Sequence, residues 1–199
     1  LVAAGFAPMY RQRSLDDPAL ASARRAVDLV LKGHEPFPAL AVDRHWNLVA
    51  HNALVPMLMA GAAPELVQAP INVLRLSLHP DGLASRIANL AQWRAHLLER
   101  LQQQIAATGD AVLQALHDEL EAYPTPSVSH DAPAANTELS GVVVPFQLVT
   151  PNGVLSFIST TTIFGTPVDV TLQELAVESF FPADAQTAAA LTALAAQPT

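Results

Sequence analysis

The sequence predicts an α+β fold, with a five-stranded antiparallel sheet, helices on one face and a helical insert after the second strand. Three observations predict it. A strand–turn–strand pattern runs straight into a helix near residue 50, helical periodicity fills residues 53–122, and β-branched sequence dominates residues 142–181. Because the two β regions enclose the helical one, we expect both to contribute to one sheet. The expected strands lie near residues 39–43, 47–51, 142–150, 154–164 and 171–181.

The first element in order is a helix over residues 16–32. Asp16 or Asp17 is placed to cap it, Pro18 suits its first turn, and Gly33 suits its end. A short connector marked by prolines, residues 34–38, follows.

The first hairpin pairs residues 40–42 with residues 48–50 across a turn at residues 43–47. Asn52 then stands where a helix N-cap belongs, and the helix continues over residues 53–59 to a glycine. A hairpin that leads directly into an asparagine-capped helix resembles the opening of PAS-type sensor domains. We therefore expect a PAS-like order of elements.

Helices are expected through the middle of the chain. Residues 72–78 form a turn or two, and a long amphipathic helix runs from Leu83 to Ile105 with apolar residues at three- and four-residue steps. Asp110 caps the next helix, which ends at Pro124. Residues 124–139 are rich in Pro, Ser, Ala and Asn and are expected to form an exposed loop.

The C-terminal third is expected to be β. The Asn-Gly pair in Pro151-Asn152-Gly153 is typical of a tight hairpin turn between residues 142–150 and 154–164. A second turn is expected at residues 165–169, before the last strand. An alanine-rich helix over residues 184–196 closes the chain.

Charge and composition limit the classes of function. The formal net charge is −8, and Lys32 is the single lysine, so the chain lacks the basic footprint of a DNA-binding domain. There is no cysteine, which excludes disulfides, thiolate metal sites and a cysteine nucleophile. No apolar run reaches the roughly 18 residues of a membrane span. We expect a cytoplasmic protein that does not bind a membrane.

Catalytic motifs are missing from the sequence, with no Gly-x-Ser-x-Gly elbow, phosphate-binding glycine loop or His-Glu-x-x-His. His45 and His51 flank the first hairpin and could form a metal site with Asp43, but side chains on two short strands could equally point apart. We predict no enzyme activity, no metal and no cofactor.

Arg75 and Trp93 each allow two interpretations. Arg75 lies among leucines, so it either forms an ion pair or capping contact with Asp43 or Glu174, or it binds a ligand carboxylate. His79 and Asn89 are second choices for that ligand contact. Trp93 is either a core residue or a pocket wall.

Five segments in order resemble the MmyB-like transcription regulators, a helix-turn-helix family of the xenobiotic-response-element (XRE) type. They are LVAAGFAPMYRQRSLDDPAL, FPALAVDRHWNLVAHN, NVLRLSLHPDGLASRIANLAQWRAHLL, TGDAVLQALHDELEAYP and TPNGVLSFISTTTIFGTPVDVTLQELAVESFFPAD. The resemblance implies a PAS-like ligand-binding domain, here residues 37–199, which binds a small apolar ligand such as a fatty acid. It implies that residues 1–36, a linker and helix, follow a helix-turn-helix domain missing from this chain, through which alone DNA would be bound. Symmetric operators would then call for a homodimer, with the helix at residues 16–32 and the C-terminal helix as contacts.

The ligand pocket is expected between the sheet and the long helix. Two alternatives remain: a dimerisation or interaction module without a ligand, and a small hydrolase-like enzyme. Small polar residues on the expected strand 154–164, Ser156, Ser159, Thr160 and Thr161, favour a pocket over a collapsed core. The candidate ligand-binding residues are Leu74, Arg75, Leu78, His79, Ile87, Asn89, Leu90, Trp93, Leu97, Phe146, Leu148, Phe157 and Ser159.

Overall fold

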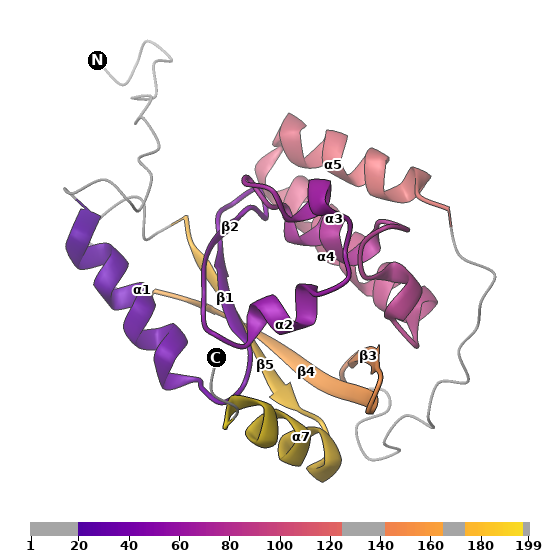
Figure 1. The fold of residues 1–199 in the computed structure, drawn as a ribbon. Helices are drawn as coiled ribbons and strands as arrows, with labels where there is room; N and C mark the ends of the chain where they lie inside the picture. The colour runs from indigo at the N-terminus through magenta and orange to yellow at the C-terminus, as the bar shows by residue number, and fades with distance from the viewer. Residues whose placement is uncertain (1–19, 125–141, 165–173, 197–199) are drawn as a thin grey trace.

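A computed structural model describes residues 20–124, 142–164 and 174–196 (Figure 1). Asp16, Asp17, Pro18, the turn at 165–169 and nearly all of the loop expected at 124–139 lie outside these residues. The helices are α1 (Ala21–Gly33), α2 (Val55–Met59), α3 (Val73–Leu78), α4 (Leu90–Thr108), α5 (Ala111–Ala122) and α7 (Ala185–Ala195), with 3-10 turns η3 (Pro64–Val67) and η4 (Ala84–Arg86). The strands are β1 (Ala39–Val42), β2 (Leu48–His51), β3 (Phe146–Thr150), β4 (Gly153–Ile163) and β5 (Ala176–Pro182).

The five strands form one antiparallel sheet in the order β2-β1-β5-β4-β3, which confirms the predicted α+β, PAS-like fold. The first hairpin and the C-terminal strands meet where β1 pairs with β5, with Ala41 opposite Val177. In the β3–β4 hairpin Thr150 pairs with Gly153, whose φ of 118° suits glycine. The N-terminal hairpin and the C-terminal strands, which are far apart in the sequence, therefore form one continuous sheet.

Both faces of strand β1, which lies between β2 and β5, are covered. Leu40 and Val42 belong to the main core beneath the helical insert, whereas Ala39 and Ala41 pack with Val27 and Leu31 of α1. Since successive strand residues point to opposite faces, the insert covers one face and α1 lies on the reverse face (Figure 1). The predicted boundary between residues 36 and 37 stays a prediction.

The long helix begins later than its apolar pattern predicted. Residues 84–86 form the η4 turn, and α4 starts only at Leu90. Ile87 forms an antiparallel bridge with Leu148, and the amide of Ala88 donates to the carbonyl of Gln147 at 2.9 Å. The backbone of residues 87–88 is thus bonded to the edge strand β3 rather than to a helix.

Asn52 is not the N-cap of α2, contrary to the prediction. Its Oδ1 accepts from the amides of Ala39 (3.2 Å) and Leu54 (3.3 Å), and its Nδ2 donates to the carbonyls of Leu31 (3.3 Å) and Phe37 (2.7 Å). The helix starts three residues later, at Val55. Asn52 therefore ties together the end of α1, the start of β1 and the turn before α2.

Three other helices have a side-chain N-cap, and the cap at Asp110 confirms a prediction. Asn72 caps α3, Asp110 caps α5 and Asp184 caps α7, each with a side-chain oxygen that accepts from a backbone amide of the first turn. None of the described helices is long and apolar enough to cross a membrane.

Candidate functional site

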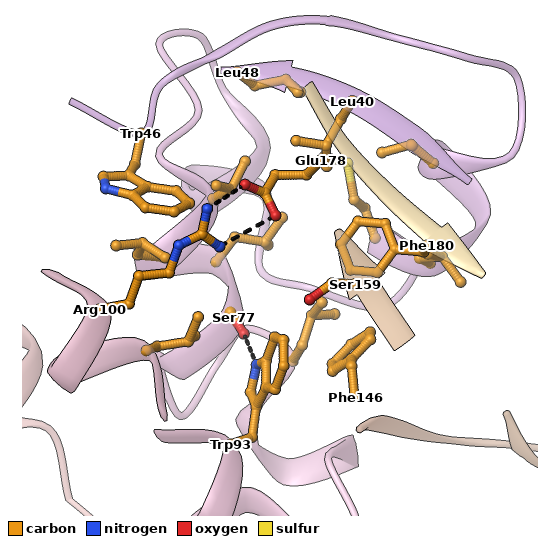
Figure 2. Close-up of a pocket in the computed structure, with 18 residues that line it drawn as sticks. Leu40, Trp46, Leu48, Ser77, Trp93, Arg100, Phe146, Ser159, Glu178 and Phe180 are labelled. Atoms are coloured by element: carbon orange, nitrogen blue, oxygen red, sulfur yellow. Dashed lines mark hydrogen bonds and ion pairs between the residues drawn. The ribbon is translucent and has the colours of Figure 1, made fainter. Parts of the chain in front are cut away.

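A mainly apolar cavity of about 90 Å³ lies between the inner face of the sheet and helices α2, α3 and α4 (Figure 2). All five strands contribute side chains to one side. The lining residues are Leu40, Trp46, Leu48, Val55, Leu58, Met59, Val73, Leu74, Leu76, Ser77, Leu83, Trp93, Leu97, Arg100, Phe146, Ser159, Glu178 and Phe180.

Aromatic rings form one end of the cavity. The ring of Trp93 on α4 lies 5.1 Å from that of Phe146, and Phe180 lies 6.0 Å from Phe146 between centroids. The indole nitrogen of Trp93 donates to the hydroxyl of Ser77 at 3.0 Å, so the buried donor is satisfied. Ser159 points into the enclosed space and adds a small polar group (Figure 2).

An ion pair forms part of the opposite end. Arg100 on α4 donates to both carboxylate oxygens of Glu178 on β5, at 2.6 and 3.2 Å, and Thr161 donates to the same carboxylate at 2.8 Å. The Glu178 side chain is 6% exposed and the Arg100 side chain 27%. A buried carboxylate is tolerable here because the guanidinium grips it bidentately.

Trp46 stacks against this ion pair, with the Arg100 guanidinium 4.6 Å from the ring centroid. Its indole nitrogen donates to Gln104 at 2.9 Å, and Gln104 in turn donates to the carbonyl of Arg44 at 2.9 Å. Trp46 has a φ of 67°, a conformation that bulky residues seldom adopt. Asp43 holds the turn in shape by accepting from the amides of residues 45 and 47.

The sequence profile of the MmyB-like transcription regulator ligand binding domain matches residues 23–194. The chain belongs to this family. No curated protein matches it. The MmyB-like domain is thus a ligand-binding, regulatory part of transcription regulators, as its sequence segments predicted.

The structure brings five of the predicted ligand-binding residues to the cavity of this MmyB-like domain. Two sit on α4, and the others come from α3 and from two strands. Others of the predicted set lie elsewhere: Phe157 and Leu78 are buried in the core, Leu148 lines a separate groove, and Ile87 bridges to β3. For every residue of the predicted set, inside or outside the cavity, a role in ligand binding stays a prediction. The five cavity residues are Leu74, Trp93, Leu97, Phe146 and Ser159.

Arg75 does not line the cavity. Its Nε and Nη2 donate to Glu119 of α5 at 2.7–3.0 Å, and Tyr123 donates to the same carboxylate at 2.5 Å. Arg75 therefore has the ion pair that one interpretation predicted, but its partner is Glu119 instead of Asp43 or Glu174. That hydrogen bond from Arg75 holds the pKa of the Glu119 carboxyl below its usual range, against the opposing effect of partial burial.

Leu90, His79 and Asn89 also lie outside the cavity lining. The ring of His79 packs edge-on to Tyr123, at 5.0 Å between centroids. Asn89 Nδ2 donates to the carbonyl of Pro145 at 2.8 Å, and its Oδ1 accepts from the amide of Gln147 at 3.3 Å, so this side chain fixes the start of β3.

Sequence reasoning missed Arg100, Glu178 and Trp46. Two signals pointed to the ion pair. Glu178 shares the inward face of its strand with Ala176 and Phe180, and Arg100 follows Leu97 by one helical turn. A charged residue on each of two apolar faces is the pattern of a buried pair. Trp46 gave no signal, because it lies within a turn.

The histidines of the first hairpin do not gather around a metal. His45 Nε2 contacts the Asp110 carboxylate at 2.9 Å, and His51 Nδ1 lies 3.0 Å from the carbonyl of Asn52. Within residues 20–124, 142–164 and 174–196 no three His, Asp or Glu side chains come close enough to hold a metal ion. The His45 contact lowers the pKa of the Asp110 carboxyl.

Proposed function

We propose that this domain senses a small, largely apolar molecule held in the cavity between the sheet and α4. The observation that carries the proposal is an apolar enclosure with few polar groups, Ser77, Ser159 and the Arg100–Glu178 pair. Binding sites for small molecules have this composition, in which apolar walls supply affinity and a few polar groups fix orientation. We assign no catalytic step to these residues.

The size of the cavity limits what it holds without moving. At roughly 10–15 Å³ per water-sized group, 90 Å³ accommodates about six to nine such groups. A fatty acid, the ligand class that the family resemblance implies, fits with a short chain as the walls stand. Longer chains require Leu58 or Met59 of α2 to move.

We propose that ligand binding controls a DNA-binding domain of the same regulator in the cytoplasm, since a net charge of −8 does not favour binding of DNA by this chain itself. We further propose a homodimer. Leu29 and Val30 of α1 are 68% and 41% exposed, which gives α1 an apolar strip for a second copy. Light scattering of the wild type and of Leu29→Glu tests this, and a monomeric wild type contradicts it.

Tryptophan fluorescence gives a direct test of the cavity. The chain has two tryptophans, Trp46 and Trp93, and both line it. Titration with linear acids and alcohols of four to fourteen carbons should change their emission. Affinity should rise by about 0.8 kcal/mol per methylene, roughly fourfold, while added methylenes remain buried.

A matched pair of variants shows whether the ligand occupies this space. Ser159→Leu fills the cavity and should weaken binding of every ligand. Thr160→Leu places the same leucine side chain at the next, exposed position of β4 and should leave binding unchanged. Equal affinities for the two variants would show that the ligand binds elsewhere, and no binding at any chain length would favour the interaction module without a ligand.

A further inference from the structure

A second hollow lies on the other side of α2. It is a groove of about 710 Å³ between α2, the β3–β4 turn and α7. Its walls are largely apolar, with Met57 and Leu58 from α2, Leu148 and Leu155 from the sheet and Leu194 from α7. The groove is therefore several times larger than the inner cavity and has similar walls.

Only a thin partition separates the two spaces. Leu58 lines both the groove and the inner cavity. Of its two neighbours, Met57 lines only the groove and Met59 lines only the inner cavity. The partition is a five-residue helix without a side-chain cap, and methionine and leucine side chains can change rotamer to admit a ligand. Displacing Leu58 would join the groove to the cavity.

Arg86 gives the groove a positive charge. Its Nη1 donates to the carbonyl of Ala60 and its Nε to that of Val149 at 3.4 Å. Among the described residues no carboxylate pairs with Arg86, in contrast to Arg75 with Glu119 and Arg100 with Glu178. The chain as a whole has a net charge of −8, but the guanidinium of Arg86 is a local cation beside apolar walls. Such a site is complementary to a ligand with an anionic head and an apolar tail.

We propose that the groove is the outer part of the ligand site. The ligand is a linear amphiphile with a carboxylate head, which Arg86 binds in the groove. The alkyl tail passes Leu58 and ends in the inner cavity near Trp93. This inference rests on the proposed function and adds where the head group binds and how the ligand is oriented.

Bromine at the two ends of a ligand tests the orientation, because bromine quenches tryptophan at short range and neither tryptophan lines the groove. With 12-bromododecanoate the bromine reaches the cavity, and we expect strong quenching. With 2-bromododecanoate it stays at Arg86, and we expect weak quenching at equal saturation, measured by calorimetry. Equal quenching, or stronger quenching by the 2-bromo acid, overturns the proposal.

Substitution of Arg86 tests the head group. Arg86→Gln should weaken dodecanoate binding about ten- to hundredfold and leave dodecanol binding within about twofold, because only a charged hydrogen bond is lost. Arg75→Gln, which removes a cation outside both spaces, is the matched control and should leave both ligands unchanged. If Arg75→Gln alone weakens the acid selectively, Arg75 is the anchor and the proposal fails.

Substitution of Leu58 tests whether the groove and the inner cavity form one site. Leu58→Ala should strengthen binding of dodecanoate relative to hexanoate, because the partition is lowered, whereas Leu58→Phe should do the reverse. Unchanged ratios in folded variants, checked by circular dichroism, overturn the joined site. A domain that binds neither acids nor alcohols of any length, in wild type and variants alike, instead refutes the proposed function.

Discussion

Two walls of the inner cavity, one around the Arg100–Glu178 pair and one formed by α2, differ in how they are held. The wall of Trp46, Arg100 and Glu178 has a bidentate ion pair, a guanidinium 4.6 Å from an indole ring and a chain of hydrogen bonds through Gln104. The α2 wall is five residues long and has no side-chain cap. The first is fixed by directional polar contacts, and the second by apolar packing that another apolar molecule can replace.

This difference indicates which wall moves. Displacing the ion pair would leave charges without partners in an apolar space, which costs several kcal/mol. Displacing Leu58 or Met59 exchanges one apolar contact for another. We therefore expect a ligand to enter at the α2 side and to pack against the ion-pair side, which stays in place.

Breaking the fixed wall should have the largest effect. Glu178→Gln removes the charge that neutralises Arg100 and should lower the free energy of unfolding by about 3 kcal/mol, the lower end for a buried pair because Arg100 is partly exposed. Urea denaturation measures it. The double variant Arg100→Met with Glu178→Leu should recover most of the loss, and a double variant as unstable as Glu178→Gln would contradict the argument.

Hydrogen exchange should show the difference between the walls directly. Amides of α2 should exchange through local opening at least about tenfold faster than those bonded around Trp46, a difference of about 1.4 kcal/mol. Reference amides are those of Trp46, bonded to Asp43 at 3.0 Å, and of Val73, bonded to the carbonyl of Trp46 at 2.9 Å. Equal protection of the two regions would remove the basis for a movable α2.

The smallest effect is expected at Arg75 and Glu119, an ion pair outside the cavity. Their side chains are 43% and 36% exposed, so Glu119→Gln should lower stability by less than about 1 kcal/mol. Because Arg75 holds the pKa of Glu119 below its ordinary value near 4.3, the contribution is present above about pH 4.3. It is lost as the pH falls through the lowered pKa.

Unfolding of the wild type and Glu119→Gln from pH 7 to pH 2 measures this contribution. The two curves should converge as the pH falls. A gap that stays constant would show that the Glu119 charge contributes nothing. A loss of stability in Glu119→Gln as large as that in Glu178→Gln would contradict the expectation that the exposed ion pair contributes less than the buried one.

The fold could be predicted from the sequence because its signals are local. Runs of β-branched residues, the Asn-Gly turn, and the caps Asn72, Asp110 and Asp184 are local signals. The break in residues 83–89 could not be predicted, since their apolar spacing suits a helix, while Ile87 and Ala88 pair with the strand β3, the amide of Ala88 bonding to Gln147. Tertiary pairing overrides propensity at such positions.

The candidate site was only partly predictable for the same reason. Trp93 and Leu97 follow from the apolar face of α4. The pairing of Arg100 with Glu178 joins residues that are 78 apart in the chain. For Arg75, the sequence alone left several acidic residues as candidate partners. Sequence spacing identifies charges on apolar faces, but the choice of partner depends on how the elements pack.

The four hydrogen bonds of the Asn52 side chain connect the segment before α2 to α1 on the far side of the sheet. One planar amide, with its donors on the carbonyls of Leu31 and Phe37 and its acceptor on the amides of Ala39 and Leu54, fixes the last turn of α1 relative to the start of α2. Aspartate lacks the two donors, and glutamine is one methylene longer, so neither can replace it. A displacement of the first turn of α2 must therefore either stretch these bonds or move α1 as well. The Asn52 side chain thus couples the positions of the two helices.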